Sequence, residues 1–314
     1  MQYPDASLSA EGDAVVISIN PIAGARSAQP RIERAVELLA GKGYQVETRS
    51  DLDEAAELAN RLSAQGRLRA LVGVGGDGTA AELVNRTAAG MPLAMLPAGN
   101  ENLLARHVDW GRSAEELCRT ISDGKLMRLD AGVANGRIFL LMLGCGFDAD
   151  VVHRVHSRRK GHIRSRNYFK PIFESIRSYE YPELRLHCDD GPRPGETDSA
   201  GQALPAVVRW LFAFNLPCYG GGLKLAPQAD GADGLLDICA FQRGSLASVL
   251  RYATAVVLRR HQRLADCTTA RVRRLKITSD REVHYQLDGD PGGTLPVTVE
   301  ALPNRVTILA PGKD

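Results

Sequence analysis

Short apolar runs alternate with helix-periodic segments through the first 127 residues of the 314-residue chain. Apolar residues three and four positions apart predict helices that bury one side, and the short runs between them predict strands. The runs are AVVISI, YQVETR and ALVGV, and the first helical face comprises Ile32, Ala35, Val36 and Leu39. This β-α-β-α-β order predicts a mainly parallel sheet and an α/β domain over residues 1–127.

After residue 127 the pattern changes to shorter strands joined by tight turns. Asn135-Gly136 is a strong two-residue hairpin signal, and residues 243–261 predict one helix. The Gly-, Pro- and Asp-rich stretch 189–205 predicts a long exposed loop between two strands, and LKITSD, EVHYQLD and RVTILA predict further strands. We therefore expect a second, β-rich domain over residues 128–314. Its terminal segment is a candidate for returning to the first domain.

Composition narrows the classes of protein. Lys+Arg 39 against Asp+Glu 37 gives a net charge of +2, so attraction to phosphates or to an anionic membrane must come from local clusters. The six cysteines form no C-x-x-C pair, which predicts reduced thiols rather than a zinc or disulfide scaffold. No apolar run reaches the roughly 18 residues of a membrane span, and the N-terminus does not resemble a signal peptide. We expect a cytoplasmic protein that does not cross a bilayer.

The stretch GVGGDG, residues 73–78, satisfies G-x-G-x-x-G between a predicted strand and a predicted helix. The dinucleotide fingerprint also requires an acidic residue about 20 positions later, which is missing, and the chain has no Walker loop. What remains is a loop of backbone N–H groups that can hold phosphate, with Asp77 beside it. A carboxylate there indicates Mg²⁺ or a base, and hence phosphoryl transfer. The alternative is a tight turn in which Asp77 and Thr79 cap the helix.

Three blocks in order resemble the diacylglycerol kinase catalytic domain shared by bacterial lipid kinases, sphingosine kinases and ceramide kinases. They are NPIAG (20–24), GVGGDGT (73–79) and LPAGNENLLAR (96–106). Further blocks extend the resemblance through most of the chain: GCGFDADVV (144–152), NLPCYGGGLKLAPQADGADGLLDI (215–238) and LDGDP (287–291). The resemblance implies a three-layer α/β nucleotide-binding domain, a β-sandwich-like domain, and an active site in the cleft between them.

The resemblance also implies residue roles. The base toward the lipid hydroxyl would be Asp77 or Asp290, and the sequence leaves both open. Two positions depart from the family pattern: Asn100 replaces the usual threonine or serine, and Asp290 replaces a glutamate, which shortens the carboxylate by one methylene. The nucleotide-binding residues would be Asn20, Gly75, Gly76, Gly78, Thr79, Asn100 and Glu101, all after predicted strands, where parallel sheets bind ligands.

Two acidic segments are candidates in the second domain. By resemblance Asp148 and Asp150 would face the cleft, with Asp150 toward the lipid head group, while helix capping is the alternative for Asp148. In ADGADGLLD, the resemblance implies that Asp233 and the carbonyl of Leu235 hold a structural Mg²⁺. The alternative there is a solvated turn before a strand.

A basic cluster lies between Val151 and Phe173, where no acidic residue occurs. RRKGHIR within it resembles a stretch in sphingosine kinases whose arginines reach the ATP phosphates, which implies such a role for Arg158, Arg159 and Arg164. Attraction to an anionic membrane surface is compatible with this role, and a solvated helix face is the alternative. Membrane contact of this kind should be peripheral and sensitive to salt.

The resemblance thus implies an ATP- and Mg²⁺-dependent lipid kinase of phospholipid metabolism. It would phosphorylate a hydroxyl of a diacylglycerol-like or sphingoid lipid at the inner membrane surface. One alternative is an NAD kinase, which also carries G-G-D-G-T. Another is a non-catalytic regulator that binds nucleotide or lipid. A nucleic acid is not an expected partner, because no aromatic-rich sheet, zinc spacing or helix-turn-helix pattern accompanies the basic residues.

Overall fold

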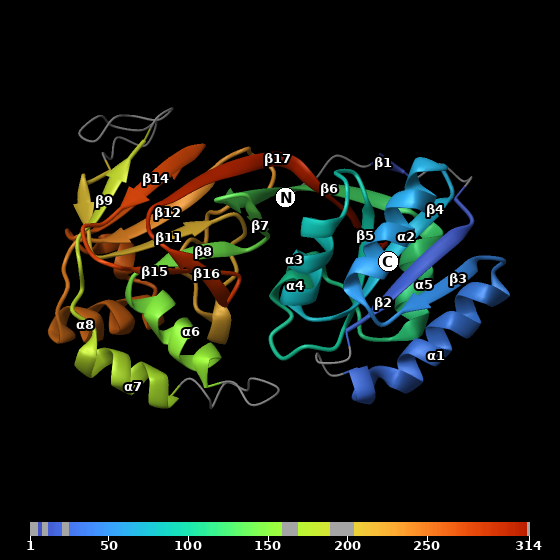
Figure 1. Ribbon diagram of the computed structural model, residues 1–314, viewed down its shortest axis with the longest axis horizontal. Helices are drawn as coiled ribbons and strands as arrows, with labels where there is room; N and C mark the ends of the chain where they lie inside the picture. The colour runs from blue at the N-terminus through green and yellow to red at the C-terminus, as the bar shows by residue number, and fades with distance from the viewer. Residues whose placement is uncertain (1–5, 8–11, 21–24, 159–168, 189–203, 313–314) are drawn as a thin grey trace. The chain divides into compact units, whose positions relative to one another are not determined.

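The computed structural model describes residues 6–7, 12–20, 25–158, 169–188 and 204–312 (Figure 1). The chain divides into two compact units, one comprising Met1–Leu129 with Asn304–Asp314 and the other Asp130–Pro303. Two strands, β6 (Lys125–Ala134) and β17 (Val297–Leu309), run from one unit into the other. Unit 1 and unit 2 below refer to these two parts.

Unit 1 is built on a parallel sheet with the strand order β17-β5-β4-β2-β3. All eight residues of β4 are buried, as expected of a strand covered on both faces. The mainly parallel sheet predicted from the sequence is confirmed. Its other strands are β2 (Ala14–Ile19), β3 (Gln45–Arg49), β4 (Leu68–Gly75) and β5 (Pro92–Pro97), and β1 (Ala6–Ser7) pairs antiparallel with β6.

Helices cover both faces of this sheet. One core cluster combines Val15 and Ile17 of β2 with α1 and α5, while α2 and α3 contact each other and the sheet. Three of the four residues predicted for the first helical face are fully packed, and Val36 is partly buried against the same cluster. The helices are α1 (Ala25–Gly41), α2 (Leu52–Ala64), α3 (Asp77–Arg86), α4 (Leu103–Val108) and α5 (Ala114–Asp123).

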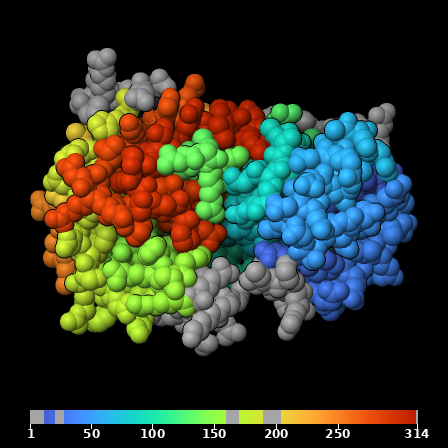
Figure 2. Space-filling view, viewed as in Figure 1, coloured from blue at the N-terminus to red at the C-terminus, as the bar shows by residue number. Residues whose placement is uncertain are grey.

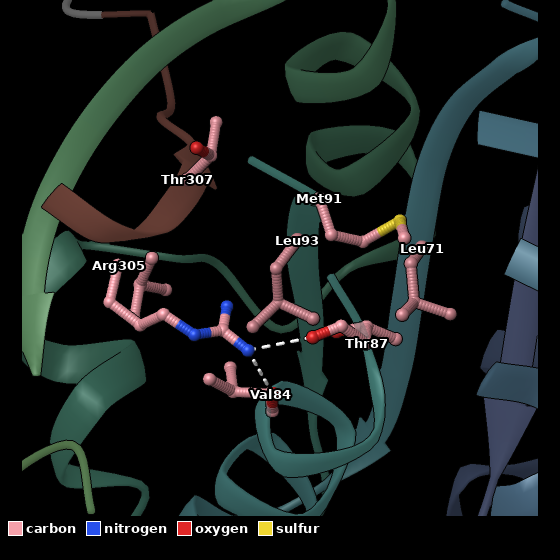
Figure 3. A pocket seen from close by; sticks show the side chains of 8 residues that line it. Leu71, Val84, Thr87, Met91, Leu93, Arg305 and Thr307 are labelled. Atoms are coloured by element: carbon pink, nitrogen blue, oxygen red, sulfur yellow. Dashed lines mark hydrogen bonds between the residues drawn. The ribbon is translucent and has the colours of Figure 1, made fainter. Parts of the chain in front are cut away.

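Arg305 of β17 ties the terminal segment to the end of α3. Its guanidinium donates to the carbonyl oxygens of Val84 (2.7 Å) and Thr87 (2.6 Å), which a helix C-terminus leaves without partners (Figure 3). Burial lowers the pKa of Arg305. The same guanidinium borders a small cavity lined by Leu71, Val84, Thr87, Met91, Leu93, Arg305, Val306 and Thr307 (Figure 3).

Unit 2 contains two antiparallel layers. One has the order β10-β9-β14-β17 and the other β13-β12-β11-β8-β15-β16. The elements are β7 (Arg137–Phe139), β8 (Met142–Cys145), α6 (Phe147–Ser157), α7 (Phe169–Ser178), β9 (Leu184–His187), β10 (Val207–Val208), β11 (Trp210–Phe214), β12 (Leu236–Phe241), α8 (Leu246–Val257), β13 (Cys267–Val272), β14 (Arg274–Thr278), β15 (His284–Leu287) and β16 (Asp290–Thr294), with short 3-10 turns at Gly220–Gly222 and His261–Arg263.

The two layers share one hydrophobic core. Leu186 and Ile277 from the first layer pack in the same cluster as Leu211 and Ile238 from the second. This arrangement is a β-sandwich, as predicted. The predicted hairpin is also present: β6 pairs with β7 around Asn135-Gly136, and both turn residues have positive φ, 47° and 87°.

Several expectations from composition can be compared with the structure. All six cysteines are free thiols, and four of them are buried. Among the described residues, no helix is both long enough and apolar enough to cross a membrane. Most of the predicted loop 189–205 lies outside the described residues.

Asp288 fixes the position of β8 relative to the hairpin formed by β15 and β16. Its carboxylate accepts hydrogen bonds from the backbone N–H groups of Leu140 (2.7 Å), Leu141 (2.8 Å) and Met142 (3.0 Å). In return, the N–H of Asp288 donates to the carbonyl of Met142 at 2.9 Å. The residue has φ of 53°, in the left-handed region that aspartate tolerates better than most residues. One carboxylate therefore accepts three consecutive backbone N–H groups at the start of β8.

We predict that Asp288→Asn lowers the free energy of unfolding by about 2 kcal/mol, because an amide NH₂ would face N–H donors that need an acceptor. Urea unfolding would measure the change. The matched control is Asp280→Asn, which breaks an exposed ion pair with Arg185 and should cost less than about 1 kcal/mol. Equal losses in the two variants would contradict the role given to Asp288.

Candidate functional site

Two loops at the carboxyl ends of β4 and β5 touch through their glycines. A Cβ placed on Gly99 would lie 2.7 Å from the Cα of Gly76, closer than real side chains approach. The N–H of Ala98 also donates to the carbonyl of Gly75 at 2.9 Å. A residue larger than glycine at position 99 would push the two loops apart. With glycine at both positions, the backbones of the blocks GGDGT and AGNEN are in direct contact and form one continuous surface. This edge is where open parallel sheets bind ligands.

Asp77 links this surface to the next helix. Its two carboxylate oxygens accept from the N–H groups of Leu103 (2.9 Å) and Leu104 (2.8 Å), the first residues of α4. Burial raises the pKa of Asp77, and these N–H bonds partly offset the rise. The capping alternative is wrong for α3, because its N-cap residue is Gly76 and no side chain caps the helix. Asp77 instead caps α4, which fixes the orientation of its carboxylate.

Asn20 and Thr79 join the end of β2 to the same loop. The Nδ2 of Asn20 donates to Oγ1 of Thr79 at 3.1 Å, and the backbone N–H of Asn20 donates to the carbonyl of Val74. Thr79 is buried, so its hydroxyl serves this internal contact rather than a helix cap. The structure thus brings Asn20, Gly75, Gly76, Gly78 and Thr79 together. Residues 21–24 of the NPIAG block lie outside the described residues.

Asn102 belongs to the AGNEN segment (98–102) that the resemblance places at the nucleotide site, but the sequence did not predict its role. It is buried, has φ of 48°, and is the N-cap residue directly before α4. Its side chain accepts from the N–H of Gly99 (3.0 Å) and donates to the carbonyl of Gly99 (2.7 Å). Asn100, exposed, and Glu101, half-buried, occupy the turn that this clamp closes. An asparagine directly before an apolar helix is the signal that could have revealed it.

In unit 2, Asp148 is held by two side chains. Tyr219 donates to its Oδ1 in a short hydrogen bond, and Gln286 donates to its Oδ2 at 3.0 Å. Burial raises the pKa of Asp148, and both donors lower it. The capping alternative is wrong for this residue, since the N-cap residue of α6 is Gly146 and no side chain caps the helix. Asp148 is instead part of a partly buried polar network with Tyr219 and Gln286.

Asp150 joins two helices. Its Oδ2 accepts from Nε of Arg154 (2.7 Å) and from Oγ of Ser175 (2.6 Å), so α6 and α7 share this carboxylate. The residue is 9% exposed. A lipid head group would therefore have to compete with two internal donors. The predicted lipid contact of Asp150 stays a prediction.

Asp290 is the first residue of β16, and its side chain is more exposed than that of Asp150. Its side chain is 38% exposed, and its Oδ1 lies 3.5 Å from Nε2 of His156 on α6. The red segment around β16 contributes to the visible surface of unit 2 (Figure 2). Asp290 is thus an accessible carboxylate with a basic neighbour.

The basic cluster is only partly described. Arg158, at the end of α6, donates to Glu174 of α7 at 2.5 Å, and Arg154 pairs with Asp150. Acidic residues on either side of the run therefore neutralise part of its charge. Arg159 and Arg164 lie outside the described residues, so the predicted phosphate contacts of all three arginines stay predictions.

The candidate Mg²⁺ residues lie beside other buried carboxylates. Asp233 accepts from the N–H of Leu235 at 3.0 Å. Nearby Asp237 is fully buried, and neither carboxylate oxygen has a hydrogen bond of normal geometry in the described part of the chain. Burial raises the pKa of Asp237 to about 6; Arg271, 3.7 Å away, opposes the rise, while Asp233 adds to it.

This charge excess would suit a cation. Within the described ranges, however, no three acidic, histidine or cysteine side chains are arranged as a metal-binding group. A site made from one carboxylate and backbone carbonyls, which is what the resemblance implies, needs no such group.

Two family models match the chain. The "Diacylglycerol kinase catalytic domain" matches residues 14–134, and the "YegS C-terminal NAD kinase beta sandwich-like domain" matches residues 142–310. Among curated relatives, a diacylglycerol kinase of Bacillus subtilis is 26% identical over 94% of this chain and 95% of its own length. One from Mycobacterium tuberculosis is 28% identical over 93% of each chain.

Solved structures support the fold. A putative diacylglycerol kinase from Bacillus anthracis aligns with a TM-score of 0.72 and 19% identity over 96% of both chains. An NAD kinase from Archaeoglobus fulgidus in complex with ATP aligns with a TM-score of 0.52 and 13% identity, covering 96% of this chain and 94% of that one. The chain belongs to the family of kinases in which a diacylglycerol kinase catalytic domain is joined to an NAD kinase-like β-sandwich domain.

Proposed function

We propose that this protein is an ATP- and Mg²⁺-dependent lipid kinase that transfers the γ-phosphoryl group to a hydroxyl of a diacylglycerol-like or sphingoid lipid. The observation that supports it most is the joined backbone surface of Gly76 and Gly99 at the sheet edge of a kinase-family domain. The names of the curated relatives favour diacylglycerol as the acceptor.

The ATP phosphates would lie on the glycine loop at the start of α3. Because no side chain caps this ten-residue helix, its first N–H groups and its dipole favour an anion there. Asn20, Thr79 and the turn at Asn100 and Glu101 would hold the rest of the nucleotide, and Arg158, Arg159 and Arg164 are the proposed partners of transferring charge. Phosphoryl transfer asks mainly for such positioning and charge neutralisation.

Two carboxylates would handle the acceptor hydroxyl. Asp77 is held rigidly by two N–H donors, which keeps its oxygens oriented. Asp290 is accessible and has an imidazole neighbour. We propose that both are needed for transfer, and the choice of the base between them stays open. Asp148 and Asp150 are the proposed contacts of the acceptor.

Mg²⁺ would enter in two ways. Bound to ATP, it neutralises charge on the β- and γ-phosphates during transfer. A second ion, held by Asp233 and the carbonyl of Leu235, would compensate the buried carboxylate charge around Asp237.

The test of function is the transfer of labelled γ-phosphate from ATP·Mg²⁺ to a panel of acceptors. The panel contains diacylglycerol, monoacylglycerol, sphingoid base, ceramide and NAD. A labelled lipid is the expected product. Labelled NADP alone would show an NAD kinase, which the shared fold makes the second candidate. ATP binding without any labelled product would favour a non-catalytic regulator.

We predict that Asp77→Asn lowers kcat for lipid phosphorylation at least about 100-fold, the usual contribution of a positioned proton acceptor. The matched control is Asp51→Asn. Asp51 caps α2 by accepting from the N–H groups of Asp53 and Glu54. The Asp51→Asn variant therefore weakens a helix cap and leaves the glycine loop unchanged. Both variants should lose about 1 kcal/mol of stability. If Asp77→Asn were as active as Asp51→Asn, Asp77 would be only a cap.

Asp290→Asn should also abolish turnover while leaving the melting temperature nearly unchanged, because its side chain is 38% exposed. Asp290→Glu should retain activity, since the longer carboxylate is the residue that the family pattern has at this position. Steady-state kinetics with circular dichroism melts would measure both. An active Asp290→Asn variant would leave Asp77 as the remaining base candidate.

We further predict that Mg²⁺ without nucleotide raises the melting temperature by about 3 °C at tenfold excess over its Kd, because binding to the native state alone stabilises it. Asp233→Asn should remove this response, while Asp280→Asn should keep it. Differential scanning fluorimetry with a magnesium titration is sufficient. A response that survives Asp233→Asn would place the ion elsewhere.

A further inference from the structure

Helix α8 of unit 2 is apolar on the side that faces solvent. Its twelve residues, LASVLRYATAVV, contain a single charged residue, Arg251. A helix that is apolar all round is normally buried on every side. Here Leu246 is 49% exposed, Leu250 56%, Val257 65%, and Leu258 just beyond the helix 59%.

These exposed residues form one stripe. At 100° per residue, Leu246, Leu250 and Val257 fall within about 40° of one another around the helix axis. The residues that anchor α8 to unit 2, including Val249, Tyr252 and Val256, are buried on the other side. The outer stripe is therefore separate from the apolar side with which α8 packs against the core of unit 2. It is a second apolar face without a partner in the described structure.

Positive charge borders the stripe. No acidic residue occurs between Asp237 and Asp266, whereas five arginines do. Arg243 and Arg251 pair with Asp266, which is buried beneath them. No ion pair in the described part of the chain involves the other three, Arg259, Arg260 and Arg263, which follow the helix directly.

The neighbouring helix α7 adds to this surface chemistry. It packs against α8 and exposes Ile172 (38%) and Phe173 (60%). The guanidinium of Arg177 lies 5.7 Å from the ring centre of Phe173. Helix α7 also reaches the surface in the space-filling view (Figure 2). All large hydrophobic residues that are exposed in the described ranges belong to unit 2.

We infer that the outer face of α8 docks the protein onto an anionic bilayer. Leu246, Leu250, Val257 and Leu258 would enter the interfacial region, and Arg259, Arg260 and Arg263 would contact lipid phosphates. An apolar stripe with a basic border and no acids is the pattern of interfacial helices. The arginines match the phosphates of anionic lipids in charge. A second copy of the chain is the alternative occupant, which the sedimentation test below detects. The inference concerns binding and does not depend on the proposed transfer reaction.

Vesicle flotation tests it. The wild-type protein should bind vesicles of phosphatidylcholine with phosphatidylglycerol, and 0.5 M NaCl should weaken this binding without abolishing it, because salt screens charge but not apolar insertion. Leu250→Gln with Val257→Gln should weaken binding about tenfold. Arg259→Gln with Arg260→Gln should weaken it about thirtyfold and reduce the preference for anionic lipid, because only Arg263 of the three remains.

Matched controls lie outside this surface. Val207→Gln changes an exposed apolar residue on β10, and Lys42→Gln with Arg61→Gln removes two exposed charges from unit 1. Both should bind vesicles like the wild type. Unchanged binding of the α8 variants would overturn the inference. So would a concentration-dependent dimer in sedimentation that Leu250→Gln with Val257→Gln abolishes, because the face would then be a subunit interface. The vesicle result stands whether or not lipid phosphorylation is detected.

Discussion

The need to pair backbone N–H groups at the ends of strands shapes both units of this protein. In unit 1, Asp77 accepts the first N–H groups of α4, and in unit 2, Asp288 accepts three consecutive N–H groups at the start of β8. A buried N–H without an acceptor costs about as much free energy as a lost hydrogen bond. Each carboxylate therefore holds a loop that the sheets alone would leave unsupported. Both aspartates lie in sequence blocks that also carry the candidate chemistry.

A structural role does not exclude a chemical one for Asp77. An ionised carboxylate offers about four acceptor positions, and the two N–H donors at Asp77 occupy only part of them. Burial raises the pKa of Asp77, while the two N–H donors lower it. The same two hydrogen bonds hold the carboxylate in a fixed orientation. In the proposed nucleotide site, the close contact of Gly76 with Gly99 would determine where a phosphate approaches. Asn102 keeps that contact in place from behind.

Charge in this chain is organised locally rather than globally. A net charge of +2 conceals a basic run whose described arginines, Arg154 and Arg158, pair with flanking acids. It also conceals the arginines after α8, which make no ion pair with other described residues. Buried acidic residues near Asp237 form the opposite pattern, since burial raises the pKa of that carboxyl to about 6. The basic run, the arginines after α8 and the acidic residues near Asp237 therefore differ in how their charge is compensated, and we expect a different ligand at each.

The sequence by itself determined the parallel sheet, the β-sandwich, the Asn135-Gly136 hairpin and the motif blocks, because these depend on local periodicity and turn chemistry. It could not show that Asp77 caps α4 rather than its own helix, that Asn102 clamps Gly99, or that Asp288 serves three N–H groups. Such contacts join residues from separate elements, and only packing brings them together. The exposed stripe of α8 was hidden for the same reason: an apolar run reads as core until the tertiary structure decides which side it buries.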